Sequence, residues 1–506
     1  MSRKAWYAGA LCAFVSACAP SPLPTVYRPA QVWPTKGWSF STPEAQGIDS
    51  NALANAIETI RAKRIPIHSL FMERNGYVVL DAYFFPFEDN ETHNLASVTK
   101  SVISTLVGIA KAEHRIGTLE QPVLATFPGE RPGDGDPRKS RITLANLLSM
   151  TSGLDCAGRP GENLLLEMEH SPDWVAFMLD RPQVSEPGAV FEYCGGNMHL
   201  VSAALTKVMD TSAYDLAREA IFEPLGITRA VWPADPNGIS HGFADLELQP
   251  RDAAKLGYLW LHHGRWEGRQ IVPETYLSEA LTPHAKVQPG IDYGYGFWLY
   301  PSHTPFDFEA NGRGGQRITV TPAENLVEVV TAGGADANAV APLLAAAVRS
   351  DVPLPANASG DARLAEAVGA AAQPPRARNP APPPRWAYAI AGRTWVLGDN
   401  SLGLRTLRLS ITADDRVSAR LGFADGTIGD HPVGMDGVPG LSVDPATGHR
   451  VALLGWWADG AFELDYDEVA RIDDYRLRLV PAGAGLDIRL WERTGLVDMR
   501  LTGKPA

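Results

Sequence analysis

A serine and a lysine three positions apart, Ser97 and Lys100, stand directly before an apolar run over residues 102–110. Residues at this spacing lie on one face of a helix, and a serine in the first turn lies beside backbone N–H groups without helical partners. A hydroxyl near an amine or ammonium, with N–H donors that can stabilise an oxyanion, can attack a carbonyl carbon. The same residues also fit an N-cap serine followed by a solvated lysine.

A tyrosine stands at the start of a second helical pattern. Tyr193 lies in the segment 191–197, ahead of a helical pattern over residues 200–208. If its hydroxyl points at Ser97, a nearby ammonium would favour the phenolate, and Tyr193 could accept a proton and later return it. The alternative is a core aromatic residue at a strand-to-helix turn.

A glycine-rich segment over residues 310–316 runs into strand-like residues 318–330. Glycines allow the backbone of an edge strand to approach a substrate closely. A backbone N–H in this segment would complete an oxyanion hole with that of Ser97. Without the other two segments it would be read as a plain hairpin turn.

Together the three segments resemble the serine hydrolases related to class C β-lactamases and penicillin-binding proteins, whose signatures are Ser-x-x-Lys, Tyr-x-Asn and a Lys/His-x-Gly strand. Residues 142–154, 250–257 and 293–298 are also similar to segments that line the site of this family. The resemblance covers roughly residues 40–350.

The resemblance implies a role for each residue. Ser97 would be the acylated nucleophile, and Lys100 would take or perturb its proton. Tyr193 would be the general acid and base, while the backbone N–H groups of Ser97 and Gln316 would hold the oxyanion. Acylation would release an alcohol or amine, and water would then attack the acyl-enzyme. Neither a metal nor an organic cofactor is implied.

Two departures from the family signatures concern the substrate. Gly195 stands where an asparagine is expected two residues after the tyrosine, and Asn197 follows two residues later. Arg313 replaces the lysine or histidine of the third signature and is followed by Gly314 and Gly315. A guanidinium can still bind a carboxylate. We expect these four residues, Asn197, Arg313, Gly314 and Gly315, to contact the substrate.

Both departures favour an ester or amide substrate. The chain is then similar to the carboxylesterases and the 6-aminohexanoate-dimer hydrolases of this superfamily. A true β-lactamase or D-Ala-D-Ala peptidase is the first alternative. The second is a catalytically decayed envelope protein that binds peptidoglycan peptides or a partner.

The N-terminus predicts export. Arg3 and Lys4 precede a mainly apolar stretch over residues 5–17, which is too short for a membrane-spanning helix and fits a secretory signal. The segment ends at Cys18 in a sequence that resembles a bacterial lipobox, so Cys18 would be lipidated. Ala19 after it suggests sorting to the outer membrane. We therefore expect a lipid-anchored envelope protein that faces the periplasm.

The chain has four cysteines. If Cys12 leaves with the leader and Cys18 carries lipid, Cys156 and Cys194 remain in an oxidising compartment. By the family resemblance both border the same cleft, and we predict a disulfide between them. Two independent buried thiols are the alternative.

We predict an α+β architecture in two domains. The signal peptide and lipobox occupy residues 1–18, and a proline-rich tether occupies 19–36. The β-lactamase/transpeptidase-like domain spans 37–355. The resemblance implies that it has an antiparallel sheet flanked by helices, built from strands around 69–85 and 318–330, and a helical lobe over about 115–290. Residues 338–348 are read as its last helix. A Pro/Ala-rich linker follows over 356–385 and includes a short alanine-rich helix over 361–372. Residues 386–506 alternate with a period of two between turn signals, which predicts a small antiparallel, barrel-like domain. This domain could cap the cleft, bind a ligand or only add stability.

Composition excludes several functions. The chain has 506 residues and a formal net charge of −13 at pH 7, and it has no basic run, so a nucleic-acid partner is not expected. Metal-ligand spacings such as His-Glu-x-x-His and nucleotide-binding glycine patterns are missing. We expect no metal site, and we expect His199 and His241 to be satisfied polar residues.

Overall fold

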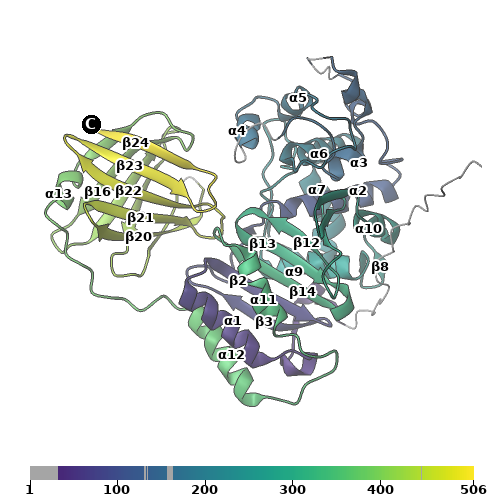
Figure 1. The fold of residues 1–506 in the computed structure, drawn as a ribbon, viewed down its shortest axis with the longest axis horizontal. Helices are drawn as coiled ribbons and strands as arrows, with labels where there is room; N and C mark the ends of the chain where they lie inside the picture. Colours follow the sequence, from purple (N-terminus) through teal and green to yellow (C-terminus); the bar gives the residue numbers. More distant parts are fainter. Residues whose placement is uncertain (1–31, 130–132, 134, 157–162, 446) are drawn as a thin grey trace, which may run out of the picture.

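The computed structural model describes residues 32–129, 133, 135–156, 163–445 and 447–506 (Figure 1). The expected leader and Cys18 lie outside these residues. The described chain forms two bodies side by side: an α+β body that ends with α12 (Ala358–Ala371), and a β-barrel preceded by α13 (Ala387–Ile390). None of the helices in these ranges is long and apolar enough to span a membrane.

A nine-stranded sheet forms the centre of the first body. Neighbouring strands are antiparallel, except that β1 runs parallel to β3. In spatial order the strands are β1 (Ser39–Phe40), β3 (Tyr77–Tyr83), β2 (Ile67–Arg74), β14 (Leu326–Ala332), β13 (Gln316–Thr321), β12 (Asp307–Gly312), β11 (Trp298–Tyr300), β10 (Ile291–Tyr293) and β9 (Ala285–Gln288). The strands predicted around residues 69–85 and 318–330 are therefore confirmed.

Helices cover both faces of this sheet. On β14, Val327 and Val329 pack into the core formed with α2 (Val98–Ala112) and α9 (Pro250–Leu261). Leu326 and Val330 pack into a second core on the opposite face. Helices α1 (Ser50–Lys63), α11 (Ala341–Ala345) and α12 cover that face. The alternation of side chains along the strand thus gives both faces an apolar surface to bury.

Helix α2, which begins immediately after Ser97, lies in the interior. Residues 98–110 are all buried, because the sheet covers one side of the helix and the helical lobe covers the other. The lobe, predicted over about 115–290, contains α3 (Leu144–Leu148), α4 (Asn163–Glu169), α5 (Trp174–Leu179), α6 (Gly195–Met209), α7 (Ala213–Ala217), α8 (Glu223–Leu225) and α10 (Glu274–Ala280). Burial on both sides is expected of a helix that lies between a sheet and a second layer of helices.

The second body is a nearly closed antiparallel barrel of ten strands. The gap between the two edges of the sheet is crossed by a bridge between Gly434, directly after β18, and Leu454 of β20. The strands are β15 (Thr394–Leu397), β16 (Leu404–Ile411), β17 (Val417–Phe423), β18 (Ile428–Val433), β19 (Gly440–Val443), β20 (Arg450–Ala458), β21 (Ala461–Glu468), β22 (Asp474–Ala482), β23 (Gly485–Glu492) and β24 (Asp498–Pro505). The predicted barrel-like fold is confirmed.

Two segments near the end of the first body differ in part from the sequence interpretation. The short helix expected over 361–372 is confirmed as α12, but its Leu364 and Ala367 pack in the core beside α1 instead of lying in a linker. The helix expected over residues 338–348 is broken into a 3-10 turn (Ala337–Ala339) and the short α11. At the other end, Trp33 of the predicted tether packs against Tyr258 and Trp266. Burial of these apolar side chains lowers the free energy of the folded protein relative to their exposure to water in a linker.

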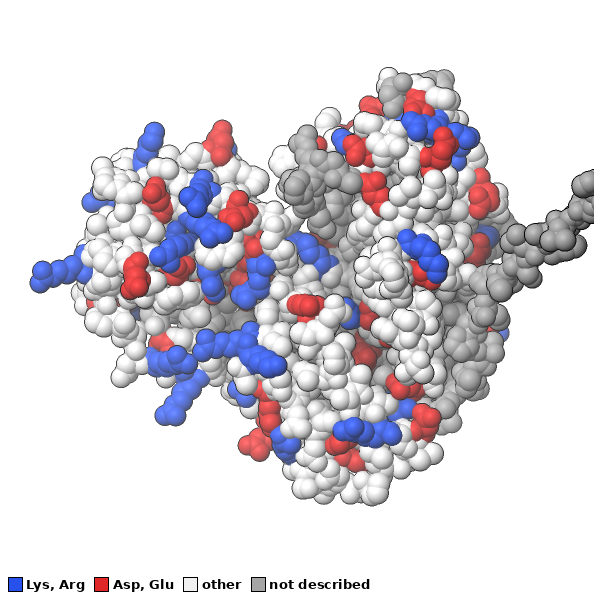
Figure 2. All heavy atoms as spheres, viewed as in Figure 1, with Lys and Arg blue, Asp and Glu red and all other residues white. Residues whose placement is uncertain are grey.

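Charged side chains of both signs are interspersed on the face of the molecule shown in Figure 2. The barrel carries most of the lysine and arginine visible there, with acidic side chains among them.

Candidate active site

Ser97 occupies the N-cap of α2, and its hydroxyl is bonded to Lys100. Lys100 Nζ donates to Ser97 Oγ at 2.7 Å and to the carbonyl oxygen of Phe243 at 2.7 Å. The Ser97 side chain makes no capping hydrogen bond, and Lys100 is only 2% exposed. The geometry therefore differs from that of a capping serine followed by a solvated lysine.

The turn before Ser97 is strained and braced. Ala96 has φ = +46°, a conformation that residues with a Cβ atom rarely adopt. Its N–H donates to Asn94 Oδ1 at 2.7 Å, and Asn94 Nδ2 donates to Asp245 Oδ1 at 3.0 Å. Burial alone would raise the pKa of Asp245, but hydrogen bonds from His241 and Asn94 outweigh it and lower the pKa. Asp245 is thus kept ionised as an acceptor for the turn.

Tyr193 faces the same lysine. The centroid of its ring lies 4.9 Å from Lys100 Nζ, within the range of a cation–π contact. The ring packs against Trp298 at a centroid distance of 5.5 Å and edge-on against Tyr293 at 6.2 Å. The structure thus brings together the three side chains predicted to be catalytic, Ser97, Lys100 and Tyr193.

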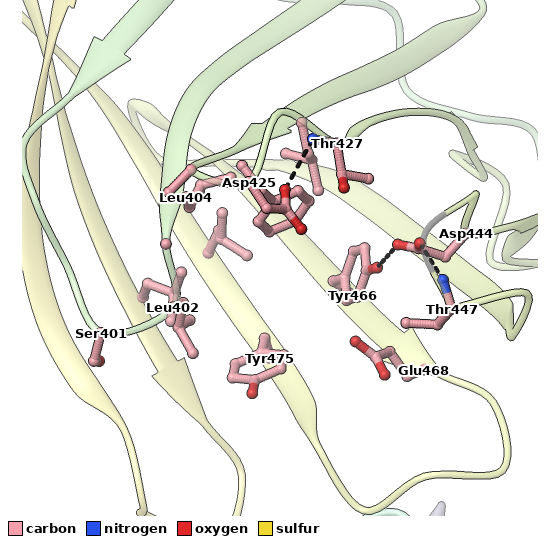
Figure 3. A pocket seen from close by; sticks show the side chains of 16 residues that line it. Ser401, Leu402, Leu404, Asp425, Thr427, Asp444, Thr447, Tyr466, Glu468 and Tyr475 are labelled. Atoms are coloured by element: carbon pink, nitrogen blue, oxygen red, sulfur yellow. Dashed lines mark hydrogen bonds between the residues drawn. The ribbon is translucent and has the colours of Figure 1, made fainter. Parts of the chain in front are cut away.

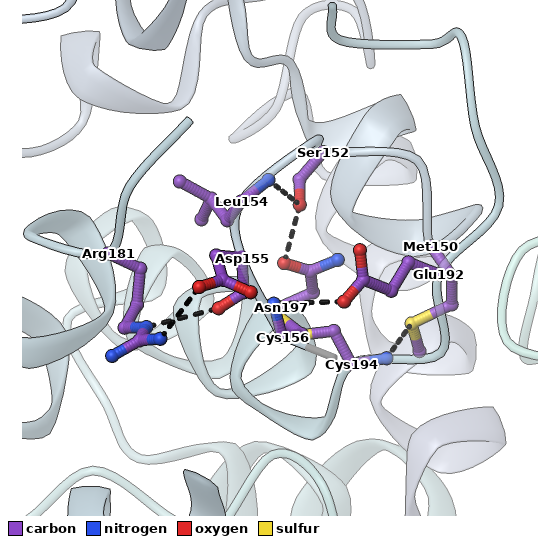
Figure 4. The surroundings of a disulfide bond; sticks show 9 residues. All are labelled: Met150, Ser152, Leu154, Asp155, Cys156, Arg181, Glu192, Cys194 and Asn197. Carbon is purple, nitrogen blue, oxygen red and sulfur yellow. Dashed lines mark hydrogen bonds and ion pairs between the residues drawn. A yellow bond between two sulfur atoms is a disulfide. The ribbon is translucent and has the colours of Figure 1, made fainter. Parts of the chain in front are cut away.

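A disulfide fixes the backbone beside Tyr193 (Figure 4). It joins Cys194 to Cys156, with Cα atoms 5.7 Å apart, and confirms the predicted pair. The Cys156 N–H donates to Glu192 Oε1 at 2.9 Å, and the Cys194 N–H donates to Met150 Sδ at 3.5 Å. Both neighbours of Tyr193 in the chain are therefore anchored.

The glycine-rich turn between β12 and β13 contacts the turn before Ser97. A Cβ atom on Gly312 would lie 2.5 Å from the carbonyl oxygen of Leu95 and 2.9 Å from the Cβ atom of Ala96. Only glycine permits this approach. Gly314 and Gly315 follow with φ of +78° and +97°, values that favour glycine.

Gln316, at the start of β13, is fixed by its own side chain. Its Nε2 atom donates to the carbonyl oxygen of Ala332 at 2.6 Å, and its Oε1 atom accepts the Ala332 N–H at 3.0 Å. These two hydrogen bonds fix the main chain at Gln316, whose backbone N–H is the predicted second oxyanion donor. The two segments that supply the predicted donors therefore meet.

Arg313 contacts the barrel. Its Nη2 atom donates to Asp473 Oδ1 at 2.7 Å, and its Nη1 atom donates to Glu492 Oε1 at 3.3 Å and to Thr494 Oγ1 at 2.8 Å. The guanidinium borders the cleft, but two carboxylates of the second body already neutralise it. The sequence predicts that Arg313 contacts the substrate, whereas the structure shows barrel carboxylates at its guanidinium.

Asn197 lies inside the helical lobe. Its side chain is fully buried, and its Oδ1 atom accepts a hydrogen bond from Ser152 Oγ at 2.9 Å. Because α6 begins at Gly195, Asn197 falls within its first turn and is directed into the lobe (Figure 4). It is not one of the residues that line the cleft.

A cleft of about 480 Å³ opens at Ser97 between the two bodies. The helical lobe supplies Leu165, Trp174 and Phe243 to its lining. The barrel supplies the facing apolar wall, formed by Leu402, Ile472, Tyr475, Leu496 and Val497. Sequence reasoning assigned no barrel residue to the site, because nothing in a sequence pattern links residues three to four hundred positions apart.

His241 also lines the cleft, although the sequence suggested only a satisfied polar residue. Its Nδ1 atom lies 2.9 Å from Asp245 Oδ2, and its ring stacks on Phe243. His199, by contrast, is buried against Asp235. Among the described residues no group of three or more His, Cys, Asp or Glu side chains could hold a metal ion.

Solved structures share the fold. A protein from Bacillus anthracis, described provisionally as a 6-aminohexanoate-dimer hydrolase, matches with a TM-score of 0.50 and 21% identity, over 57% of this chain and 80% of that chain. A protein from Bacteroides dorei, described provisionally as a beta-lactamase, matches with a TM-score of 0.50 and 20% identity, over 60% of this chain and 100% of that chain.

No curated protein matches the sequence. The family model for Beta-lactamase matches residues 53–352, which is more than half of the chain. The match includes α2 with Ser97, the start of α6 and the β12–β13 turn. The chain belongs to the Beta-lactamase family.

Proposed function

We propose that the protein is a serine hydrolase that acts through an acyl-enzyme on an ester or amide in the cell envelope. The observation that carries the proposal is the hydrogen bond of 2.7 Å between Lys100 Nζ and Ser97 Oγ, beside the ring of Tyr193. An amine at this distance makes the hydroxyl easier to deprotonate and therefore more nucleophilic.

The reaction would have two halves. Ser97 Oγ bonds to the substrate carbonyl carbon, its proton passes to Tyr193 directly or through Lys100, and the backbone N–H groups of Ser97 and Gln316 stabilise the oxyanion. The intermediate then expels an alcohol or amine, which takes this proton from Tyr193. Water adds to the acyl carbon and gives a proton to Tyr193. The bond between the acyl carbon and Ser97 Oγ then breaks, Ser97 Oγ takes that proton back, and the acid is released.

Two observations favour an ester or amide over a β-lactam. By the family resemblance, binding of a β-lactam would use the asparagine of the second signature and the cation of the third. Asn197 is buried, and Arg313 is paired with Asp473 and Glu492. Arg471, the other cation of the cleft, faces Glu247 and Glu468 at 3.5 and 3.9 Å. A substrate carboxylate would have to displace these partners.

The test compares hydrolysis of a short-chain p-nitrophenyl ester and of a chromogenic cephalosporin by the purified protein and by its Ser97→Ala variant. Ser359→Ala, on the surface of α12, is the matched control. We expect ester hydrolysis that is lost only with Ser97→Ala, together with fluorophosphonate labelling of Ser97. Faster turnover of the cephalosporin would indicate a β-lactamase, and a protein that neither labels nor hydrolyses would indicate a binding protein.

We also propose that the protein is attached to the membrane by lipid on Cys18 and faces the periplasm. The lipobox-like sequence before Cys18 supports this location, and the disulfide between Cys156 and Cys194 fits an oxidising compartment. The test is detergent-phase partitioning of the protein expressed in a Gram-negative host, compared with Cys18→Ser. We expect only the variant to remain in the aqueous phase, and equal partitioning would contradict the anchor.

A further inference from the structure

The barrel contains a cavity of about 460 Å³ that the proposed hydrolysis does not use (Figure 3). This volume lies in the range of pockets that bind small molecules. Strands β16, β17, β21, β22 and β23 form its walls, together with the segments that join them at one end of the barrel.

The cavity is a cup with a packed floor. Along β16, Leu404 lines the cavity, whereas Leu407 and Leu409 lie farther along the strand in the barrel core. Along β22, Leu477 lines the cavity and Leu479 lies in the core. Inward-facing side chains thus fill one end of the barrel and leave the other end hollow. Most of the wall is apolar and comes from Leu402, Leu404, Leu421, Phe423, Leu477 and Leu490.

The polar part of the wall is acidic. Asp425, Asp444 and Glu468 line the cavity, and none of the described residues lining it is lysine, arginine or histidine. Asp444 accepts a hydrogen bond from the hydroxyl of Tyr466 at 3.4 Å, and Asp425 accepts the N–H of Thr427 at 2.8 Å. Figure 3 shows Glu468 near Tyr466 and Thr447. An anionic headgroup would be repelled here, whereas an ammonium would be attracted.

Within the described chain, Glu468 pairs with a cation only through a long contact. Its nearest cation is Arg471, at 3.9 Å between Nη1 and Oε2, and Arg471 also faces Glu247 at 3.5 Å. The contact at 3.9 Å is too long for a hydrogen bond. The carboxyl of Glu468 can therefore accept a hydrogen bond from a ligand.

We propose that the barrel cavity binds an organic amine, a molecule with an apolar body and an ammonium group. The apolar body occupies the cup between Leu404, Leu421 and Leu490. The ammonium lies at the acidic side and donates to Glu468. The cavity shares Ser401, Leu402 and Tyr475 with the cleft of Ser97, so the bound amine lies next to the proposed hydrolytic site.

The test uses isothermal titration of the purified full-length protein with octylammonium, octan-1-ol and octanoate, which share one tail and differ in charge. Burial raises the pKa of Glu468 to about 7, so the titration is made near pH 8, where the carboxyl is ionised. We expect one octylammonium per chain, weaker binding of octanol and no binding of octanoate. Octanoate binding as tight as octylammonium binding would overturn the proposal.

Two variants locate the site. Glu468→Gln is expected to weaken octylammonium about tenfold and to leave octanol unchanged, because only the charged hydrogen bond is lost. Leu421→Trp fills the cup and is expected to abolish binding of both; thermal unfolding confirms that each variant is folded. If neither variant weakens octylammonium binding, the ligand binds outside the cavity and the proposal is overturned.

Two controls separate this site from its neighbours. Asp430→Asn removes a barrel carboxylate that pairs with Arg420 and does not line the cavity, and it is expected to leave octylammonium binding unchanged. Capping Ser97 with a fluorophosphonate, or replacing it with alanine, is also expected to leave binding unchanged. Loss of binding in either case would overturn the cavity as the binding site, and the outcome does not depend on whether Ser97 hydrolyses an ester.

Discussion

At the scale of single residues, Lys100 links the candidate catalytic groups. Its Nζ atom bonds Ser97 Oγ and the carbonyl oxygen of Phe243, and it lies over the ring of Tyr193. These contacts fix both the side-chain rotamer of Ser97 and the position of the Lys100 ammonium. Positioning of this kind matters because proton transfer requires hydrogen-bond geometry before it requires a matched pKa.

Removal of the Tyr193 hydroxyl tests its role as a proton carrier. Tyr193→Phe keeps the ring packing against Trp298 and Tyr293. We expect kcat for the p-nitrophenyl ester to fall about a hundredfold or more, with little change in KM. Tyr214→Phe, which removes a hydroxyl bonded to the carbonyl oxygen of Ala230 in the lobe, is the matched control. An unchanged kcat in Tyr193→Phe would assign the proton transfer to another group.

The buried carboxyl of Glu328 should make the stability of the protein depend on pH. Burial, together with Glu324, Glu309 and Asp307, raises the pKa of this β14 carboxyl to about 8. Between about pH 4.5 and 8 the folded protein keeps a proton on Glu328 that the unfolded chain releases. The free energy of unfolding therefore falls as the pH rises through this range.

Replacing this carboxyl should therefore stabilise the protein only in alkali. We expect Glu328→Gln to match the wild type near pH 4 and to exceed its free energy of unfolding by roughly 2–4 kcal/mol near pH 9. Denaturant unfolding across this pH range gives the difference. Glu366→Gln, on the exposed side of α12, is the control. A constant difference between Glu328→Gln and wild type at all pH values would refute the raised pKa.

The sequence predicted part of the site at this scale. Ser97, Lys100 and Tyr193 belong to short motifs, and their meeting requires only that α2 and α6 pack together. Phe243 contributes its backbone carbonyl, which no side-chain pattern reveals. The pairing of Arg313 with Asp473 could not be predicted either, because it depends on how two bodies dock.

At the scale of elements, the segment 150–156 and the start of α6 form one braced unit. The disulfide links positions 38 residues apart, and the neighbouring Met150 and Glu192 add hydrogen bonds. The unit fixes the main chain on both sides of Tyr193 without contacting a substrate.

Loss of the disulfide should affect both stability and rate. We expect the double variant Cys156→Ser/Cys194→Ser to lose about 3 kcal/mol of unfolding free energy, since a loop of this length restricts the unfolded chain. We also expect a lower kcat with the same KM, because Tyr193 loses its covalent anchor. Thermal unfolding and ester kinetics measure the two effects, with reduced and alkylated wild type as an independent check. Full activity in both would show that hydrogen bonds alone hold Tyr193.

Alternation and helical periodicity predicted most elements. The barrel strands alternate clearly. β14 is apolar on both faces, whereas β13 buries Ile318 and Val320 on one face only. The alanine-rich sequence before the proline run predicts the helix that is α12, but the sequence interpretation assigns it to a linker and not to the core of the first body. Its burial rests on three apolar positions, Leu364, Ala367 and Ala371, that meet α1 only in the folded domain.

At the scale of the whole molecule, the barrel is docked where it closes the cleft. Arg313 pairs with Asp473 and Glu492, and the Asn94 N–H donates to the carbonyl oxygen of Ala470 at 2.9 Å. Asn94 also braces the turn of Ser97. The second body therefore contacts the same short strand that leads to the nucleophile.

A bulkier barrel wall should select against large acyl groups. Leu496→Trp narrows the cleft opposite Ser97. We expect KM for a long-chain p-nitrophenyl ester to rise about tenfold while that for the acetate ester stays near the wild-type value, since a small acyl group needs less of the cleft. Ile428→Trp, at an exposed barrel position, is the control. Equal effects on both esters would show that this wall does not contact the acyl chain.

The late position of Leu496 and Val497 in the sequence also matters while the protein is being synthesised. A ribosome makes the chain from its N-terminus, so Ser97 is synthesised about four hundred residues before Leu496 and Val497, which complete the barrel wall. A nascent chain that stops before these two residues has its nucleophile in a more open groove. Discrimination between substrates by this wall therefore requires that synthesis has passed Val497.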